Sequence, residues 1–191
     1  MLGSPAGRLL GSGHKGMLGR AVMARLGGRG VGADLPECDI TRPDQMRDLL
    51  RRERPASVLN CAAWTDVDGA ETHPAEAARI NADAVESLGR LCREAGVHLV
   101  TISTDYVFHG EGSDPFPEDA PESAFGPQCV YGRTKLDGER RLRQAGGEWC
   151  IARAQWLYGA GGKNFIDTIA GLAAQRERLK VVDDQVGAPT W

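Results

Sequence analysis

The sequence has no apolar run long enough to cross a membrane and no long basic run. Its 23 Lys and Arg residues and 26 Asp and Glu residues are interspersed, for a net charge of −3. Nucleic acid and anionic membrane surfaces are therefore poor candidates as partners. The N-terminus also lacks the charged start and the long apolar core of a signal peptide. We expect a cytoplasmic protein with no membrane or nucleic-acid partner.

The chain also lacks the residue spacings of a metal site or a disulfide framework. Its cysteines are odd in number and include no C-x-x-C pair, so they are interpreted as buried free thiols in a reducing compartment. The four histidines show no ligand spacing. Asp66, Asp68 and Glu71 fit a solvated loop and helix start better than a metal site, so we predict no metal. The cysteines are Cys38, Cys61, Cys92, Cys129 and Cys150.

Short apolar segments alternate with helical patterns along the 191 residues, of which 41% are hydrophobic. Such alternation predicts an α/β fold with a doubly wound parallel sheet of the Rossmann type, and the length indicates one domain over residues 1–191. Strands are expected at 8–10, 30–33, 57–63, 97–102, 149–153 and 179–182. Helices are expected over 18–26, from Thr41 and Pro43 onward, and over 74–95, 131–142 and 164–175.

A glycine-rich turn joins the first expected strand to the first helix. Gly11, Gly13 and Gly16 satisfy the G-x-G-x-x-G pattern, and Gly13, Gly16 and Gly19 satisfy the related G-x-x-G-x-x-G pattern. Glycines let the backbone turn sharply and approach a pyrophosphate closely, and the helix N-terminus supplies N–H groups for the phosphates. Between strand and helix, this pattern favours dinucleotide binding over a plain glycine turn.

Asp34 ends the second expected strand at the spacing of a carboxylate that binds the adenosine ribose hydroxyls. A loop aspartate in a turn with Pro36 is the alternative. In the first interpretation Asp34 would repel a 2′-phosphate, and Leu35 follows it rather than an arginine. We therefore expect NADH to bind at least as well as NADPH.

Thr104 lies where the expected strand 97–102 passes into a loop, and Tyr131 begins the next helix with Lys135 four residues later. Residues four apart on a helix point the same way, so the phenol and the ammonium can share a pocket with the Thr104 hydroxyl. A cation about 6 Å away, at an effective dielectric of roughly 20, favours the phenolate by about 3 kcal/mol, or around 2 pK units. This arrangement predicts a tyrosine acid and base. For Thr104 alone, a hydroxyl that caps a loop is the alternative.

Together these motifs resemble the extended short-chain dehydrogenase/reductases, and within them most of all the dTDP-4-dehydrorhamnose reductases. The resemblance rests on the glycine turn, residues 60–71, Asn81, residues 103–108 and 131–135, Arg153, residues 156–159, Asn164 with Phe165, and residues 184–190. One departure is Gln155, where the family usually has serine. Another is length, because family members continue well past the 184–190 motif. The resemblance therefore implies a cofactor domain whose C-terminal substrate lobe is absent or truncated.

The resemblance implies that NADH or NADPH reduces the C4 ketone of dTDP-6-deoxy-L-lyxo-4-hexulose to dTDP-L-rhamnose, in nucleotide-sugar and polysaccharide biosynthesis. Thr104 would hold the carbonyl oxygen, Tyr131 would protonate the alkoxide, and Lys135 would lower the tyrosine pKa and bind the nicotinamide ribose. The implied cofactor-binding residues are Gly11, Gly13, His14, Lys15, Gly16, Met17, Leu18, Asp34, Asp39, Ile40, Cys61, Ala62, Ala63, Thr65, Asn81, Tyr131 and Lys135. The implied substrate-binding residues are Thr104, Asp105, Val107, Phe108, Trp156 and Asn164.

Other functions stay open beside this one. Sugar-nucleotide dehydratases of this fold carry Thr-Asp-Glu, but Tyr106 stands at the third position here and is a poor base at neutral pH. The regulatory β subunit of methionine adenosyltransferase resembles the same family and binds a dinucleotide as a partner protein. Another nucleotide-sugar reductase or epimerase, and a homodimer, are also compatible with the motifs. We expect these 191 residues to bind the dinucleotide yet to reduce the keto-sugar poorly.

Overall fold

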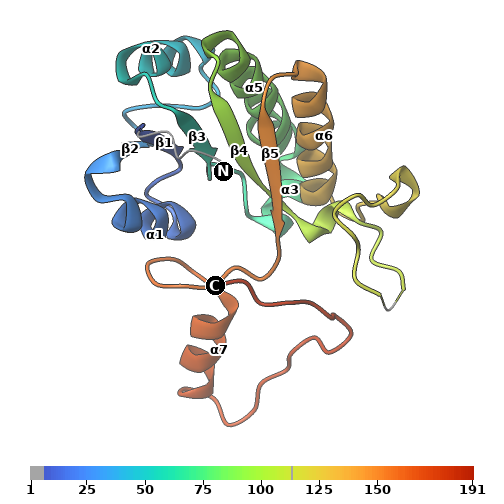
Figure 1. Cartoon of the computed structure of the whole chain (residues 1–191). Helices are drawn as coiled ribbons and strands as arrows, with labels where there is room; N and C mark the ends of the chain where they lie inside the picture. Colours follow the sequence, from blue (N-terminus) through green and yellow to red (C-terminus); the bar gives the residue numbers. More distant parts are fainter. Residues whose placement is uncertain (1–6, 113) are drawn as a thin grey trace.

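Five parallel strands form one sheet in the order β2-β1-β3-β4-β5 in the computed structural model, which describes residues 7–112 and 114–191 (Figure 1). All neighbouring pairs are parallel, so the carboxyl ends of the strands meet at one edge. The strands are β1 (Leu9–Ser12), β2 (Gly30–Ala33), β3 (Ser57–Asn60), β4 (His98–Thr104) and β5 (Trp149–Ala154).

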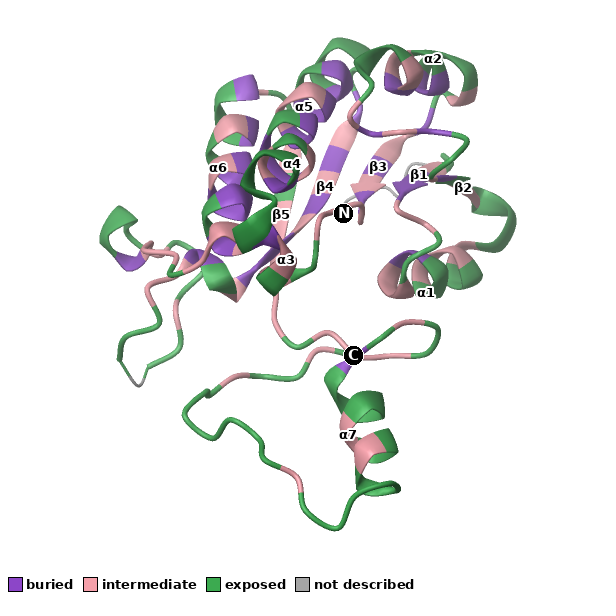
Figure 2. Cartoon of the chain, turned by 180° about the vertical axis from the view of Figure 1, so that it is seen from behind, coloured by how far each residue is buried: buried purple, intermediate pink, exposed green. Residues whose placement is uncertain are grey.

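The helices follow from the crossovers between these strands. The chain changes direction across the sheet after β2, so right-handed crossovers place the first helix on one face and the later ones on the other. Figure 2 shows α2, α5 and α6 side by side over that second face. The helices are α1 (Met17–Leu26), α2 (Pro43–Glu53), α3 (Val67–Thr72), α4 (Pro74–Ala78), α5 (Ala84–Ala95), α6 (Val130–Ala145) and α7 (Phe165–Ala173), with a π-helical turn (Arg79–Asp83) between α4 and α5.

The core lies between the sheet and this helical layer. The predicted stripe of α2 is confirmed, because Met46, Leu49 and Leu50 are all buried there. Leu88 of α5 and Leu142 of α6 are fully buried in the same cluster. Burying one such side chain stabilises the fold by about 1.5–3 kcal/mol. These buried contacts therefore fix α5 and α6 against β3, β4 and β5.

The C-terminal part differs most from the prediction. The strand expected at 179–182 is wrong, because that segment is irregular and no strand of the described chain pairs with it. Val181 and Val182 are accordingly 51% and 66% exposed. Figure 1 shows α7 and the segment after it extending away from the sheet, and α7 has no buried residue. The segment returns near its end, where the Ala188 amide donates to the Gln155 side chain and the Thr190 carbonyl accepts a hydrogen bond from the Tyr158 amide at 2.9 Å.

Two further predictions need correction. The helix expected over 74–95 is divided into α4, the π-helical turn and α5. The cysteines are free thiols, but only Cys38 and Cys92 are buried, whereas Cys150 is exposed.

Over the described residues, no helix is both long and apolar enough to span a bilayer.

Gly138 lets α6 pack tightly against the π-helical turn, because a Cβ atom there would collide with the Asn81 carbonyl oxygen. We expect Gly138→Ala to lower the free energy of unfolding by about 1–3 kcal/mol, since a backbone atom cannot move aside. The matched control is Gly171→Ala in α7, where a Cβ would meet nothing within 4 Å. That variant should be neutral or up to about 1 kcal/mol more stable. Urea titration measures both, and an undiminished Gly138→Ala stability would contradict this packing.

Candidate active site

The candidate site lies where β4 ends at the carboxyl edge of the sheet. Thr104 is the last residue of β4 and is 5% exposed. Its hydroxyl donates a hydrogen bond to the Asp105 carboxylate at 3.1 Å and accepts one from the Tyr106 amide at 3.2 Å. The strand-end hydroxyl thus caps the 3₁₀ turn that follows, as the alternative interpretation expected. The same bonds hold it at the edge where ligands of parallel sheets bind.

The start of α6 is fixed by a hydrogen bond to α3, by a side-chain cap from Cys129 and by a close approach to this turn. The Val130 amide donates to the Glu71 carboxylate at 2.7 Å, and the Gly132 amide donates to Cys129 Sγ at 3.4 Å. A Cβ atom on Gly132 would collide with the Tyr106 carbonyl oxygen, so only glycine allows this approach. Tyr131 therefore lies directly beside the end of β4.

The Tyr131 phenol is half-buried and packs edge-on against the Tyr106 ring, with centroids 5.7 Å apart. Burial raises the pKa of Tyr131 to about 12, and the nearby Thr104 hydroxyl offsets this only in part. In the chain alone the Tyr131 pKa is therefore raised rather than lowered, because desolvation of the phenolate is the largest influence on it. The effect of Lys135 on this phenol stays a prediction. Tyr131 is a protonated acid at neutral pH.

Lys135 lies one turn further along α6 and is 6% exposed. Its ammonium donates a hydrogen bond to the Ile102 carbonyl of β4 at 2.7 Å. Burial lowers the pKa of Lys135 to about 8, while Glu139 and Cys61 act in the opposite direction. The side chain thus reaches beneath the end of β4, with Cys61 close by.

The glycine turn lies against Cys61 and Ala62, the residues that follow β3. Gly13 has a φ of +67°, and a Cβ there would lie 2.5 Å from the Ala62 nitrogen and 2.7 Å from the Cys61 carbonyl carbon. The Cys61 amide donates to the Ser12 carbonyl at 3.0 Å. Gly16 begins α1 without a side-chain cap, and the first turn has no acidic residue. The turn therefore leaves an uncapped helix N-terminus next to the residues around Lys135.

Asp34 and Lys15 lie together at the end of β2. Asp34 accepts hydrogen bonds from the Lys15 amide at 2.9 Å and the Leu35 amide at 2.8 Å. The Lys15 ammonium donates to the Leu35 carbonyl at 2.5 Å and to Glu37 at 2.8 Å. Both interpretations of Asp34 fit these contacts, since the carboxylate joins the turn to β2 and remains half-buried at the surface. The Lys15 ammonium nevertheless lies nearby, so a cation is present at this end of β2 although Leu35, and not an arginine, follows Asp34.

The other residues expected to bind the cofactor in this part of the chain differ in how deeply they are buried and in what they contact. The His14 ring packs against Gly32, and its Nδ1 atom is buried with no partner in the described chain. Asp39 accepts hydrogen bonds from both the amide and the hydroxyl of Thr41 at 2.8 Å, and Ile40 belongs to the core. Met17 and Leu18 are half-buried in the first turn of α1, and Gly11 is buried in β1.

The segment after β3 carries the remaining cofactor predictions. Ala62 and Ala63 are half-buried and Thr65 is exposed at this edge. Asn81 is 1% exposed, and its amide group is occupied by both backbone groups of Trp64 and by the Thr134 hydroxyl. Asn81 thus joins this segment to α6, and its contact with a cofactor stays a prediction.

The residues expected to bind substrate are only partly brought together. Asp105 lies at the site and accepts a hydrogen bond from Gln155 at 2.8 Å. Trp156, at a φ of +47°, is 41% exposed beside it. Val107 is fully buried, so its side chain cannot meet a ligand, and Phe108 stacks on Phe116 with centroids 4.2 Å apart.

Asn164 does not face the site with its side chain. It caps α7 by accepting from the Asp167 amide at 3.0 Å and donates to the Gly159 and Gly162 carbonyls at 3.2 Å. Its amide group is thus used within the C-terminal segment, and a contact with substrate stays a prediction.

Several polar residues around the site were not among the expected cofactor-binding or substrate-binding residues, namely Ser103, Tyr106, Glu139 and Gln155. Glu139 had a visible signal, because a charged residue shares the helical stripe of Leu136 and Leu142 and is therefore buried with them. In the described residues, no group of three or more His, Cys, Asp and Glu side chains could hold a metal ion.

The chain is similar in sequence to known nucleotide-sugar enzymes. It is 44% identical over 191 residues to a dTDP-4-dehydrorhamnose reductase from Streptomyces griseus, and the match covers 98% of this chain and 62% of that protein. Residues 7–191 match the protein family described as the RmlD substrate binding domain. The chain therefore spans less than two thirds of the length of this curated relative.

Solved structures of similar reductases share the fold. The dTDP-4-dehydrorhamnose reductase from Clostridium acetobutylicum gives a TM-score of 0.90 at 38% identity, over 96% of this chain and 65% of that one. The enzyme of the same name from Bacillus anthracis, solved in complex with NADP, gives 0.91 at 34% identity, over 96% of this chain and 66% of that one. The predicted Rossmann-type sheet and the predicted resemblance are both confirmed.

The raised pKa of Tyr131 is open to direct measurement. We expect the chain and its Tyr131→Phe variant to develop the same tyrosinate absorbance up to about pH 10.5, because Tyr131 is still protonated there. The remaining tyrosines, Tyr106 and Tyr158, are common to both proteins and serve as the internal reference. One extra tyrosinate in the unsubstituted chain below about pH 9 would mean that Lys135 does control the phenol without a cofactor.

Proposed function

The chain belongs to the RmlD substrate binding domain family, and from this premise we propose that residues 1–191 bind NADH or NADPH and supply the acid of a 4-ketoreductase acting on dTDP-6-deoxy-4-keto-sugars. The observation that supports this most is the placement of Thr104, Tyr131 and Lys135 at the end of β4, next to the glycine turn. The product would be dTDP-L-rhamnose, as the names of the relatives from Streptomyces griseus and Clostridium acetobutylicum suggest.

The residues present fit a dinucleotide. The uncapped first turn of α1 offers N–H groups and a positive dipole end to the phosphates, and the absence of a side chain on Gly13 leaves the backbone accessible. Ala62 and Ala63 offer a small, half-buried surface for a flat ring. Bound there, a reduced nicotinamide supplies the hydride. Lys135, with Cys61 nearby, would bind a ribose on the same surface.

Proton transfer then falls to Tyr131. Since its pKa is about 12, the phenol holds its proton at neutral pH and can give it to the stronger base that a ketone becomes on receiving a hydride. Thr104, held by Asp105 and the Tyr106 amide, offers its hydroxyl beside the same oxygen. The Lys135 ammonium stabilises the tyrosinate left behind.

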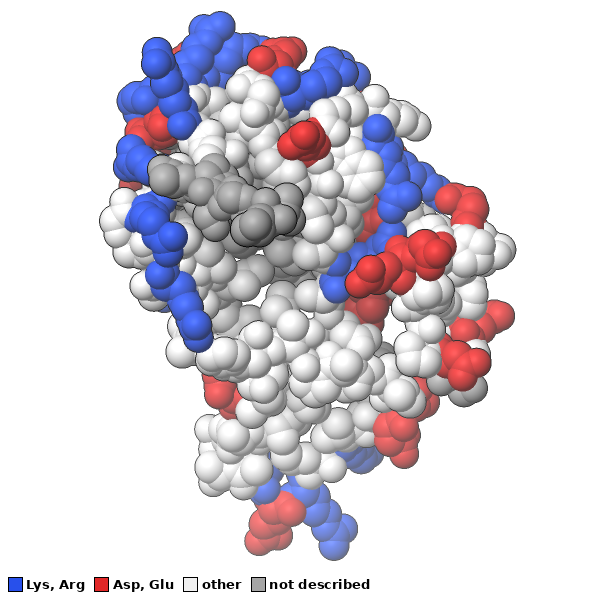
Figure 3. All heavy atoms as spheres, in the orientation of Figure 1, with Lys and Arg blue, Asp and Glu red and all other residues white. Residues whose placement is uncertain are grey.

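Tyr106 supports reduction rather than elimination. A dehydratase needs a carboxylate base at this position, whereas burial and the Asp105 charge raise the pKa of the Tyr106 phenol above its ordinary value. The sugar nucleotide would lie over the carboxyl ends of the strands, near Trp156. Figure 3 shows few charged side chains in the middle of the face in view, below the atoms drawn in grey. A homodimer and a cytoplasmic location stay predictions.

Cofactor binding is the first test. We expect fluorescence titration to show NADH bound at least as well as NADPH, because Asp34 would hydrogen-bond a 2′-hydroxyl and repel a 2′-phosphate. Lys15→Ala should weaken NADPH roughly 3- to 10-fold and NADH little, because a phosphate gains more than a hydroxyl from the ammonium. Lys180→Ala, in the irregular segment, is the control. NADPH binding more than about tenfold tighter than NADH would contradict the Asp34 assignment, and no binding of either would contradict the proposed function.

Catalysis is the second test, run in the 191-residue chain and in a chimera that continues with the remaining length of the Streptomyces griseus relative. We expect Tyr131→Phe to lower kcat by about 10²- to 10⁴-fold, because the proton donor is removed. Cofactor affinity should change little, since the phenol contributes mainly in the transition state. Tyr158→Phe is the matched control. Near-normal turnover of Tyr131→Phe, in a chimera that is otherwise active, would show that another group supplies the proton.

A further inference from the structure

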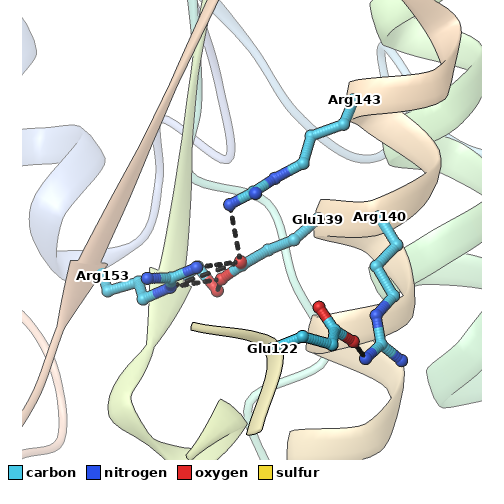
Figure 4. Close-up of polar contacts among 6 residues, drawn as sticks. Glu122, Glu139, Arg140, Arg143 and Arg153 are labelled. Atoms are coloured by element: carbon cyan, nitrogen blue, oxygen red, sulfur yellow. Dashed lines mark hydrogen bonds and ion pairs between the residues drawn. The ribbon is translucent and has the colours of Figure 1, made fainter. Parts of the chain in front are cut away.

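Glu139 is a buried carboxylate on α6 that the proposed chemistry does not use. It is 3% exposed, and Arg153 of β5 binds it as a fork, with Nε 2.9 Å from one oxygen and Nη2 2.6 Å from the other. Figure 4 shows the carboxylate between Arg153 and Arg143, and the Arg143 guanidinium lies 3.9 Å away. The Ser103 hydroxyl donates a third bond at 2.5 Å.

Arg153 is itself held on several sides. Its register partner across the sheet is Ser103, so strand pairing brings both donors to the same carboxylate. The guanidinium also lies 5.2 Å from the Phe108 ring centre and 5.0 Å from that of Phe125. Burying an ion pair costs desolvation that the attraction barely offsets, so fold stability alone does not explain this cluster.

The cluster adjoins the candidate site residue by residue. Three consecutive residues of β4 take part, each through a different group. Ile102 accepts a hydrogen bond from Lys135, Ser103 donates one to Glu139, and Thr104 carries the hydroxyl of the site. Lys135 and Glu139 lie one helical turn apart on the same face.

The groups around Lys135 come from three elements. Glu139 lies on α6, Cys61 follows β3, and the Ile102 carbonyl belongs to β4. Burial favours the neutral amine, and Glu139 is the larger of the two influences that favour the ammonium. The thiol Cys61 adds little charge at neutral pH, because burial raises its own pKa to about 11.

We propose that Glu139 is a positioning residue: clamped by Arg153 and Ser103, its carboxylate holds α6 against the end of β4 and keeps the Lys135 ammonium charged. The catalytic consequence rests on the proposed function, in which that ammonium serves Tyr131 and the ribose. The electrostatic part concerns this chain alone and needs no ligand.

Proton titration of Lys135 tests this directly. The chain is labelled with carbon-13 at the lysine ε-methylene groups, and the Lys135 signal is identified by its loss in Lys135→Arg. We expect a midpoint near pH 8 in the unsubstituted chain. In Glu139→Gln the midpoint should fall by roughly one unit. Glu122→Gln is the matched control, because Glu122 pairs with Arg140 of the same helix in the exposed pair of Figure 4, and it should change nothing.

The sign of the change in the Lys135 midpoint distinguishes a charge effect of Glu139 from a purely structural role in holding α6. If Glu139 only braced the helix, Glu139→Gln would let water reach Lys135 and raise the midpoint toward about 10.4. A raised or an unchanged midpoint therefore overturns the proposal. Should Glu139→Gln fail to fold, the double variant with Arg153→Gln leaves no unpaired guanidinium. Its midpoint should again lie below that of the unsubstituted chain, because Glu139 and not Arg153 acts on Lys135. A value at or above it overturns the proposal equally.

The same experiment separates this inference from the proposed function. A lowered Lys135 midpoint in a chain that binds neither NADH nor NADPH would support the role of Glu139 and count against the reductase. In an active chimera, Glu139→Gln should move the alkaline limb of the kcat profile to lower pH. Glu139→Asp, which restores the charge, should return it toward the original position.

Discussion

The close packing of α6 against the end of β4 is the contact on which the candidate site depends. Gly138 brings α6 against the Asn81 carbonyl, and Gly132 brings its first turn against the Tyr106 carbonyl. Neither approach would survive a side chain larger than hydrogen. With the helix this close, Lys135 reaches the Ile102 carbonyl and Tyr131 reaches Thr104, two positions apart on one strand. Two glycines thereby set the geometry of three reactive side chains.

Burial then decides the protonation of those side chains, and it acts in opposite directions on them. A buried phenol loses more solvation when it is charged, so the Tyr131 pKa rises to about 12, whereas the buried ammonium of Lys135 has its pKa lowered to about 8. In the chain alone Tyr131 is therefore a protonated acid, and the Lys135 ammonium beside it loses its proton more readily than an ordinary lysine. Glu139, paired with Arg153, opposes that loss from one turn away.

Much of this arrangement was readable in the sequence. Hydrophobic period and glycine spacing predicted the strands and helices that carry the site, and the four-residue spacing placed Tyr131 and Lys135 on one face. The pKa direction of Tyr131 was missed because spacing says nothing of what else packs around a phenol. The pairing of Glu139 with Arg153 depends on the β4–β5 register, which no local pattern encodes. The strand expected at 179–182 failed because a strand needs a neighbour, and apolar alternation alone does not supply one.

The central claim is that a dinucleotide lies along the carboxyl edge of the sheet, from the glycine turn to Tyr131. Backbone amide shifts of the 191-residue chain on adding NADPH test this most directly. We expect the largest changes at residues 13–17 and 61–63 and at Tyr131. We expect none in the groove lined by Arg51 and Leu91, at the amino edge of the same sheet. Largest changes in that groove, with residues 13–17 unmoved, would contradict the account.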